Sequence, residues 1–383
     1  MRVMRVLTRP NLGGPTRQAI ALWHAHRRLD TPTLLVTGAV DQDEAALAPS
    51  DHGVPALTYA EALAAGPAAC GWVELPDLGR RASWFADRRA ARALAGLLAA
   101  HRPEVVHTHT SKAGWLGRRA AFAAGVPVVA HTFHGHVLRD YFAAPFAWWL
   151  TRLERRLAAA TTLLFAVSAS CADELAAARV APRARFTVMP PAVPLVPPAA
   201  RAVARQRLGI AAEERVAVCI GRLVPIKRVE HFVDAVAAVP GLRGDVVGDG
   251  PERGALAALA AVRTGAVRLL GAVPDIAALM PAYDVLVLPS VREGLPLVAV
   301  EAARGGVPVV GYDVPGVRDA REFAAGELVP PAQGARGLAA AIERTLAAPA
   351  PAPRAIEACD PATIAANLLR AYRGAAAGSR SLP

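Results

Sequence analysis

Residues 289–310 read PSVREGLPLVAVEAARGGVPVV and combine a predicted strand end, a Gly-Leu-Pro-Leu turn and a helix of small residues. Glu293 lies in the predicted loop. Glu301 lies on the second turn of a helix predicted to begin near Leu297, so both carboxylates can face one crevice. The turn also brings backbone groups to a helix N-terminus, where phosphate binds readily. These phosphate-contact candidates are Gly294, Leu295, Pro296, Leu297 and Val298.

The same stretch has a purely structural interpretation. Glu301 would then be an exposed helix residue, and Glu293 would be a capping group. A spaced pair of carboxylates alone is a weak signal. The strand, the turn and the small-residue helix around the pair favour a binding site.

Short β-branched runs alternate with helical stretches on both sides of this motif. In the second half of the chain the runs begin at Arg215, Gly244, Val267, Asp284 and Val307, and in the first half at Val3, Thr33, Glu104, Val126 and Thr162. Such alternation predicts parallel strands joined by crossover helices. The expected fold class is therefore α/β, with two Rossmann-like domains and a ligand at the carboxyl ends of the strands.

The boundary between the domains is predicted in a proline-rich stretch, MPPAVPLVPPAA, at residues 189–200. Five prolines preclude regular structure there. The expected division is an N-terminal domain at 1–190, a linker at 191–200 and a C-terminal domain at 201–360. The segment 361–383 is expected to form a helix that packs back toward the N-terminal domain, with one apolar face made by Ile364, Leu368, Leu369 and Tyr372.

The composition is that of a globular protein that binds anions. The chain has 383 residues, of which 54% are hydrophobic and 20% charged, and its net charge is +11. This balance favours anionic partners such as nucleic acid, a membrane surface or phosphorylated molecules. The basic residues are dispersed, and no basic segment is interleaved with aromatic residues, so nucleic acid is not expected to be a partner.

The cysteines and the N-terminus indicate the compartment. Cys70, Cys171, Cys219 and Cys359 lie far apart, which favours neither a disulfide framework nor a zinc site. The N-terminus lacks the apolar core of a signal peptide, and no uncharged apolar stretch reaches the ~20 residues that a spanning helix needs. A cytoplasmic protein is expected.

A predicted helix near 145–157 allows a peripheral contact with the inner face of the membrane. Apolar side chains share one face and arginines lie around it; they are Phe146, Trp149, Leu150, Leu153 and Leu157, with Arg152, Arg155 and Arg156. Such a helix can lie on an anionic bilayer. A core-packed helix with a basic outer face is the more common reason for the same pattern.

Two cations follow a predicted strand in IGRLVPIKRVEHFVDAV, residues 220–236. Arg222 comes directly after Gly221, and Lys227 precedes a helix. Cations at the carboxyl end of a strand suit a diphosphate, because they neutralise it and stabilise the charge that develops on a leaving group. The alternative is a solvated loop with ordinary surface cations.

Glycines and histidines mark the first half. Gly13 and Gly14 lie between the first strand and the first helix, where they allow close approach to a phosphate or serve a tight turn. Five of the ten histidines fall between His107 and His136. Nearby lysine and arginine, and the lack of a carboxylate in the set, oppose a metal cluster. Hydrogen-bonded histidines at strand ends explain most of them.

These motifs resemble family 4 of the retaining glycosyltransferases, which have the GT-B fold of two Rossmann-like domains facing each other across a cleft. The resemblance extends over nearly the whole chain. It implies that Glu293 contacts the hydroxyls of a donor sugar and Glu301 the nucleotide ribose, while Arg222 and Lys227 bind the diphosphate. It also implies backbone contacts to the base near Asp275 and Ile276.

The resemblance assigns the first half in the same way. Gly13 and Gly14 match a glycine loop that closes over the donor diphosphate, and His134, in HTFHGH, matches a histidine beside donor sugar and acceptor. His109, Lys112 and Arg118 are weaker candidates for the acceptor side. The catalytic set is thus His134, Arg222, Lys227 and Glu293, with no metal and no cofactor.

The sequence departs from the family pattern in two places. Pro191-Ala192 replaces the usual Asn-Gly after the sixth N-terminal strand, which affects the expected hinge. Arg318-Asp319 stands where Pro-Glu is common, so no residue is assigned to that donor-side contact.

The expected activity is metal-independent transfer, with retention, from a nucleotide diphosphate sugar to an acceptor hydroxyl. UDP-sugars such as UDP-GlcNAc are the first expectation for the donor; a carbohydrate, a lipid-linked sugar and a small natural product all remain open as acceptors. The rivals are a nucleotide-sugar epimerase, a sugar phosphorylase, and a non-catalytic subunit that binds nucleotide sugar.

Overall fold

The computed structural model describes residues 1–41, 46–81, 83–135 and 144–380. The chain forms two compact units. Unit 1 comprises Met1–Pro194 and Ala358–Pro383, and unit 2 comprises Leu195–Glu357. The first crossing lies inside the stretch expected as a linker, and the C-terminal segment returns to unit 1.

Unit 1 is built on a parallel sheet. Its described residues form eight strands in the order β3-β4-β2-β1-β5-β6-β7-β8. The strands are β1 (Val3–Leu7), β2 (Thr33–Thr37), β3 (Ala56–Leu57), β4 (Gly71–Glu74), β5 (Val105–His109), β6 (Val128–Phe133), β7 (Leu163–Ala166) and β8 (Phe186–Val188). The helices are α1 (Gly14–Arg28), α2 (Tyr59–Ala65), α3 (Trp84–His101), α4 (Ser111–Ala123), α5 (Ala144–Ala160), α6 (Ala169–Ala177) and α14 (Pro361–Arg380).

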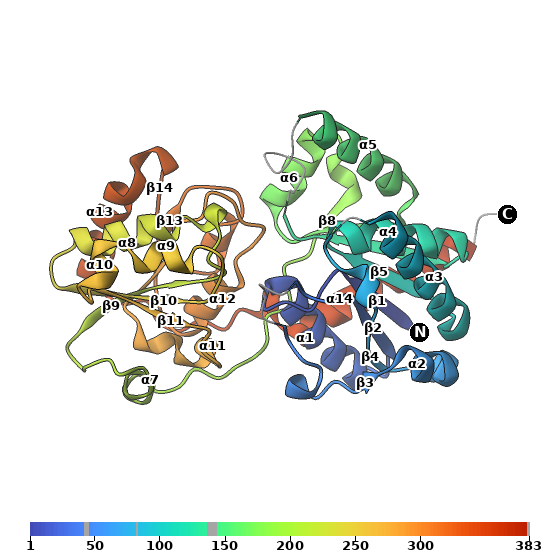
Figure 1. Ribbon diagram of the computed structural model, residues 1–383, viewed down its shortest axis with the longest axis horizontal. Helices are drawn as coiled ribbons and strands as arrows, with labels where there is room; N and C mark the ends of the chain where they lie inside the picture. Colours follow the sequence, from blue (N-terminus) through green and yellow to red (C-terminus); the bar gives the residue numbers. More distant parts are fainter. Residues whose placement is uncertain (42–45, 82, 136–143, 381–383) are drawn as a thin grey trace. The chain divides into compact units, whose positions relative to one another are not determined.

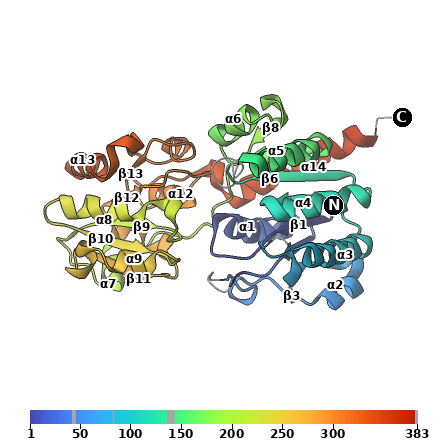
Figure 2. The same cartoon turned by 45° about the horizontal axis from the view of Figure 1, so that its top comes forward.

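Two helical layers cover this sheet. Met4 and Val6 of β1 pack with residues of α3 and α4, whereas Val3 packs with residues of α1 and α14. Side chains alternate along a strand, so Arg5 shares the face of Val3. The C-terminal helix α14, red in Figure 1 and Figure 2, lies within unit 1 and contacts α1. The last helix of the chain thus belongs to the core of its first domain.

Unit 2 is a second parallel sheet with helices on it. Its described residues form six strands in the order β11-β10-β9-β12-β13-β14. The strands are β9 (Arg215–Ile220), β10 (Leu242–Val247), β11 (Val267–Gly271), β12 (Val285–Leu288), β13 (Val309–Tyr312) and β14 (Gly326–Val329). The helices are α7 (Arg201–Leu208), α8 (Val229–Ala238), α9 (Arg253–Ala257), α10 (Ala260–Arg263), α11 (Ile276–Leu279), α12 (Leu297–Arg304) and α13 (Gly334–Ala347). The predicted α/β class with two parallel-sheet domains is confirmed.

Each sheet has one point where the strand order reverses. In unit 1 it lies between β1 and β5, which pair in parallel from Val3 and Val105 onward. In unit 2 it lies between β9 and β12, where Ala217 pairs with Val285. The loops that leave the carboxyl ends of such neighbouring strands diverge and open a crevice that binds ligands in α/β proteins. Both groups of candidate residues follow these strands.

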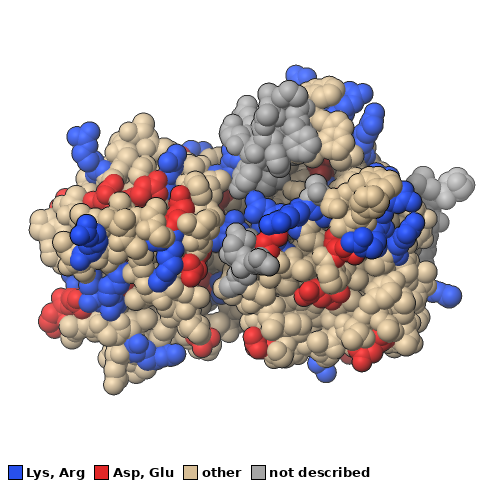
Figure 3. All heavy atoms as spheres, viewed as in Figure 1, with Lys and Arg blue, Asp and Glu red and all other residues tan. Residues whose placement is uncertain are grey.

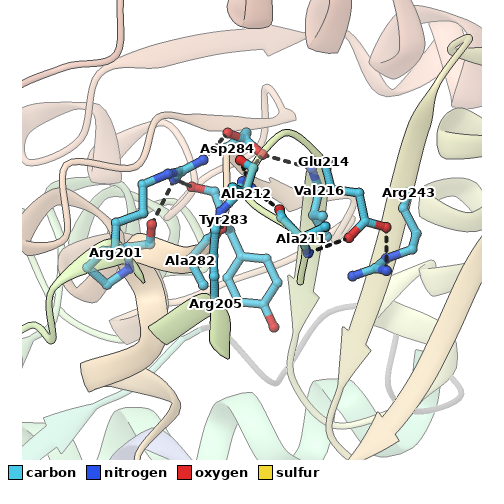
Figure 4. A network of polar contacts seen from close by, with 11 residues as sticks. Arg201, Arg205, Ala211, Ala212, Glu214, Val216, Arg243, Ala282, Tyr283 and Asp284 are labelled. Atoms are coloured by element: carbon cyan, nitrogen blue, oxygen red, sulfur yellow. Dashed lines mark hydrogen bonds and ion pairs between the residues drawn. The ribbon is translucent and has the colours of Figure 1, made fainter. Parts of the chain in front are cut away.

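A charged network fixes the start of β12. Asp284 accepts hydrogen bonds from Arg201 at 2.5 Å, from Arg205 at 3.0 Å and from the backbone N–H of Val216 at 2.8 Å (Figure 4). Arg205 is buried and donates to backbone carbonyls as well. The network joins α7 to both central strands and so orients the strand that leads to Glu293.

The surface carries mixed charge. On the face seen in Figure 3, Lys and Arg side chains are spread over both units and alternate with Asp and Glu. Within the residues that the structure describes, no helix is long and apolar enough to cross a membrane.

The helix expected to touch a membrane is α5. Trp148 and Trp149 are exposed beside the exposed Arg152, whereas Leu157 is buried. Phe146 belongs to the residues whose side chains are not described. Leu157 therefore packs in the core, and contact of the tryptophan end with a membrane stays a prediction.

Candidate functional site

The cation and the carboxylate predicted for unit 2 meet at its switch point. Lys227 ends a short 3-10 helix (Pro225–Lys227) in the loop after β9, and Glu293 lies in the loop after β12. The backbone N–H of Val291 donates to the carbonyl of Ile226 at 3.0 Å and ties the two loops together. Nζ of Lys227 lies 2.5 Å from Oε1 of Glu293, with 27% of the lysine side chain and 12% of the glutamate side chain exposed. The pair is thus accessible to a ligand.

A glycine allows close packing at the Glu293 loop, and a second glycine lies beside Lys227. Gly316 has a φ of +82°, and a Cβ there would lie 2.5 Å from the carbonyl oxygen of Glu293. Only glycine combines this backbone angle with so close an approach. A Cβ on Gly221 would lie 3.9 Å from Nζ of Lys227, so the backbone at the end of β9 borders the lysine amine.

Cys219 of β9 is buried and interacts electrostatically with Lys227 and Glu293. Burial raises the pKa of its thiol to about 12, with a further increase from Glu293 and an opposing effect of Lys227. The thiol is therefore protonated at neutral pH and is no nucleophile.

The second carboxylate lies on α12. The helix begins at Leu297, as predicted, and Glu301 on its second turn is buried with 3% of its surface exposed. Leu295, Pro296 and Leu297 are buried at the start of the helix, whereas Gly294 and Val298 are partly exposed. The N-cap residue, Pro296, makes no capping hydrogen bond with its side chain. Binding of an anion by the backbone of this turn stays a prediction.

Arg222 and Ile276 lie on loops at the same edge. Arg222 follows Gly221 and is partly exposed, and the next backbone N–H, of Leu223, donates to the carbonyl of Asp249 after β10. Ile276 begins α11 and is partly exposed, and α11 contacts α12. The loops after β9, β11 and β12 thus gather the unit 2 candidates at one edge of the sheet.

The glycines of unit 1 open α1. Gly13 precedes the helix and Gly14 is its first residue; both are partly exposed. The backbone N–H of Gly13 donates to the side chain of Asn11 at 3.3 Å. They lie at a helix N-terminus after β1, and a phosphate contact there stays a prediction.

Two of the unit 1 histidines are hydrogen-bonded to each other. Nδ1 of His109, at the end of β5, lies 2.9 Å from Nε2 of His134, which follows β6. His109 is fully buried and His134 is partly exposed. Burial lowers the pKa of both rings, and the positive charge of Arg5 adds to it; for His134 the pKa falls to about 3. His134 is therefore neutral at physiological pH.

Arg5 was missed in the sequence. Its side chain is fully buried. Its Nη1 lies 2.8 Å from Nε2 of His109 and 3.3 Å from Nδ1 of His107. The same Nδ1 lies 2.5 Å from the hydroxyl of Tyr372 on α14, and Nε2 of His107 lies 2.7 Å from Oγ1 of Thr132. The sequence did hold a signal for Arg5: an arginine inside the apolar run VMRVLT is unusual, because buried strands rarely carry a charge.

A strained residue follows His109. Thr110 has a φ of +63°, a region that β-branched residues rarely adopt and that costs about 1–3 kcal/mol. Its hydroxyl lies 2.6 Å from that of Thr8 at the end of β1. This contact across the switch point holds the conformation. Strain of this kind is concentrated at functional sites.

The acceptor-side assignment of Arg118 is wrong. Its side chain is fully buried and forms two hydrogen bonds with the carboxylate of Glu154, at 2.7 and 2.8 Å. It also donates to the carbonyl of Gly114. A guanidinium held in this way joins α4 to α5 and lines no surface.

Lys112, in the first turn of α4, forms an ion pair and a hydrogen bond within unit 1. Its amine lies 2.6 Å from the carboxylate of Asp87 and donates to the carbonyl of Arg81 at 2.7 Å. Only 11% of its side chain is exposed. It ties α4 to α3 and to the loop before α3, and an acceptor contact by Lys112 stays a prediction.

At the two departures from the family pattern, Ala192 packs in a core and Arg318 forms a surface ion pair. Ala192 is buried in the core of unit 1, and the N–H of Val193 donates to the carbonyl of Cys359. Arg318 is exposed and pairs with Asp313 at 2.7 Å. Among the described residues, no three His, Cys, Asp or Glu side chains are grouped as a metal site would require.

Two family models match the chain. "Glycosyltransferase Family 4" matches residues 13–196 and "Glycosyl transferases group 1" matches residues 214–348. Sucrose-phosphate synthase from Thermosynechococcus elongatus has a similar structure, with a TM-score of 0.76 and 21% identity over 99% of this chain and 100% of that one. At this identity the likeness shows the fold.

Two curated relatives are closer in sequence. The UDP-Gal:alpha-D-GlcNAc-diphosphoundecaprenol alpha-1,3-galactosyltransferase of Escherichia coli is 32% identical over 263 residues, which are 63% of this chain and 66% of the relative. The 2-deoxystreptamine N-acetyl-D-glucosaminyltransferase of Streptomyces fradiae is 32% identical over 291 residues, 70% of this chain and 67% of the relative. The matches thus span about two thirds of these relatives. Since the family models match both units and the GT-B fold is the one observed, the chain belongs to glycosyltransferase family 4.

Proposed function

We propose that this chain transfers a sugar from a nucleotide diphosphate sugar to an acceptor hydroxyl, with retention of the anomeric configuration. The observation that carries the proposal is the ion pair of Lys227 and Glu293 at the switch point of unit 2. A diphosphate competes for the lysine, and sugar hydroxyls compete for the carboxylate. The pair therefore offers one donor-binding group for each part of the donor.

Charge development explains how Lys227 and Arg222 act. The bond between the anomeric carbon and the β-phosphate oxygen breaks, and negative charge grows on the departing phosphate. A preorganised cation gains attraction as this happens, and only such a gain accelerates chemistry. The acceptor oxygen bonds to the anomeric carbon on the face that the phosphate leaves, and its proton passes to a phosphate oxygen. Glu293 orients the sugar, and Glu301 binds the ribose.

The donor that we propose first is a UDP-sugar such as UDP-GlcNAc. In support, one relative is named for UDP-Gal and another for N-acetylglucosaminyl transfer. The names of these two relatives give alpha-D-GlcNAc-diphosphoundecaprenol and 2-deoxystreptamine as acceptors. For this chain the proposed acceptor classes are a lipid-linked sugar, a carbohydrate and a small natural product.

The transfer is proposed to need no metal ion, because Lys227 and Arg222 supply the positive charge that a metal would bring to the diphosphate. The test is transfer of radiolabelled sugar from a panel of UDP-, GDP- and ADP-sugars to a mixed panel of acceptors, with EDTA and with Mg²⁺ or Mn²⁺. Transfer that survives EDTA is expected. Loss of transfer in EDTA with rescue by either metal would overturn the metal-free mechanism.

The same assay separates the rival activities. An epimerase converts the donor without any acceptor, and a phosphorylase consumes a sugar phosphate. A non-catalytic subunit binds donor without turning it over. Product that forms only when donor and acceptor are both present supports transfer and contradicts all three.

A further inference from the structure

Arg5 fixes the direction of every hydrogen bond between it and His134. A guanidinium only donates, whereas a neutral imidazole has one N–H and one acceptor nitrogen. Nε2 of His109 therefore accepts from Arg5, and the proton of His109 is on Nδ1. That N–H donates to Nε2 of His134. The proton of neutral His134 is then on Nδ1.

We propose that Arg5 and His109 are positioning residues that hold His134 as the Nδ1–H tautomer, so that His134 offers a hydrogen-bond donor to its ligand. The proposal rests on the proposed function only in naming that ligand. A group facing Nδ1 of His134 must then carry an acceptor oxygen, such as a hydroxyl or ring oxygen of a sugar. The nitrogen that could take a proton, Nε2, is occupied by His109, so His134 does not deprotonate the acceptor hydroxyl.

The chain of contacts is anchored at its far end. His107 stacks on His109, with ring centroids 4.4 Å apart and planes at 22°. Nη1 of Arg5 lies 3.3 Å from Nδ1 of His107, and this donor opposes a proton on Nδ1, so the proton of the ring is on Nε2 and is donated to Thr132. The single lone pair of Nδ1 accepts the hydrogen bond of the nearer donor, the hydroxyl of Tyr372 at 2.5 Å. Contacts from three strands and from α14 thus leave each ring one consistent tautomer.

The neutral state of the rings supports the same assignment. Burial lowers the pKa of His107 and His109 well below the ordinary value, and Arg5 lowers both further. A doubly protonated ring would place an N–H against the guanidinium. The pKa of His134 is lowered to about 3 by burial and Arg5.

Burying the charged side chain of Arg5 costs more free energy than burying an apolar side chain at the same position. Within the described part of the chain, its Nε and Nη2 have no hydrogen-bond partner. Removing a cation from water costs several kcal/mol, and apolar residues in such positions often stabilise a fold equally well. A role in directing hydrogen bonds accounts for a charge that the fold does not require.

The test is the protonation pattern of the histidine rings in the ligand-free protein. Protein labelled with ¹⁵N at its histidines is studied by long-range ¹H–¹⁵N correlation near pH 7, and the His134 signals are assigned by their loss in His134→Gln. The expected pattern has a protonated Nδ1 and an unprotonated Nε2. A protonated Nε2 in the wild-type protein would overturn the proposal without any variant of Arg5.

The variant arm uses Arg5→Met. Without the guanidinium, His109 is free to move its proton to Nε2, and the His134 signals should then change toward a protonated Nε2. Arg118→Met is the matched control, since Arg118 is another fully buried arginine of unit 1, bonded to Glu154. It should leave the His134 pattern unchanged. Unchanged His134 signals in folded Arg5→Met would show that Arg5 does not set the tautomer.

These spectra need no substrate, so their result is independent of the proposed function. If the pattern is as expected and no donor is turned over, only the proposed function fails. If transfer occurs and Nε2 of His134 carries the proton, only the positioning proposal fails.

Discussion

At the switch point of unit 2, Lys227 lies partly exposed against the carboxylate of Glu293, whereas at the switch point of unit 1 the cation Arg5 is fully buried against the rings of His107 and His109. The first cation can exchange its partner for a ligand. The second cannot reach a ligand and acts through hydrogen bonds. Unit 2 thus presents the exchangeable charge of Lys227, which suits a charged diphosphate. Unit 1 presents the proposed neutral N–H donor of His134, which suits an uncharged sugar hydroxyl.

The largest effect is expected for Lys227→Ala. Loss of a cation that strengthens its interaction in the transition state lowers turnover by about a hundredfold or more. Donor affinity should fall less, because part of the attraction appears only as the bond breaks. Steady-state kinetics at saturating donor, paired with calorimetric donor binding, measures both.

The matched control for this variant is Arg344→Ala, which removes an exposed cation paired with Glu327 on the same unit. It should leave turnover near the wild-type value. Near-normal turnover in Lys227→Ala, with only weaker donor binding, would mean that the lysine anchors the substrate without assisting the chemistry.

A smaller effect should separate the two glutamates of unit 2. Glu301→Ala should weaken both the free nucleoside diphosphate and the nucleotide sugar by about tenfold or more, as for loss of a charged hydrogen bond. Glu293→Ala should spare the nucleoside diphosphate and impair binding of the sugar and its transfer. Calorimetric titration of each variant with UDP and UDP-GlcNAc gives the comparison. An equal loss of UDP affinity in both variants contradicts the assignment.

A further difference is expected in the acid sensitivity of the two units. Unit 1 buries neutral histidines; burial lowers the pKa of His26 to about 3. Unfolding exposes each ring at its ordinary pKa of about 6.5. The unfolded state therefore binds more protons between about pH 6.5 and pH 3, and stability falls as the pH falls through this window, by about 1.4 kcal/mol per pH unit for each such ring.

Two buried thiols report on the units separately. Cys171 lies in unit 1 and Cys219 in unit 2. Urea midpoints from maleimide labelling of each, at about pH 7 and about pH 5.5, should fall further for Cys171 than for Cys219. His26→Gln should reduce the fall for Cys171. If the urea midpoint for Cys219 fell as much as that for Cys171, or more, unit 1 would not be the more acid-sensitive unit.

The sequence predicted those parts of the molecule that depend on local patterns. The run beginning at Arg215 is β9, the helix near Leu297 is α12, and the α/β alternation defined both sheets. Some strands were missed, among them β4 (GWVE) and β14 (GELV), because a glycine and a glutamate in each leave no run of β-branched residues. The positions of the unit 2 candidates after strands were also predicted, since each follows a strand of a recognisable motif.

Contacts across a sheet could not be predicted in this way. Arg5 and His109 are 104 positions apart, and His107 and Tyr372 are 265 apart. Only the strand order that places β1 beside β5, and α14 on the same face, brings them together. Arg118 failed as a candidate for a related reason, because its partner Glu154 lies on another helix.

The central claim is that the nucleotide binds at the switch point of unit 2 and not at that of unit 1. Hydrogen exchange with and without nucleotide tests this claim most directly. UDP, GDP and ADP are added in turn, and protection is read by mass spectrometry along the whole chain. The account predicts that the nucleotide that binds protects residues 221–228 and 289–304 of unit 2 and leaves β5 and β6 of unit 1 nearly unchanged. Protection concentrated in unit 1, or no protection at 289–304 by any of the three, would contradict it.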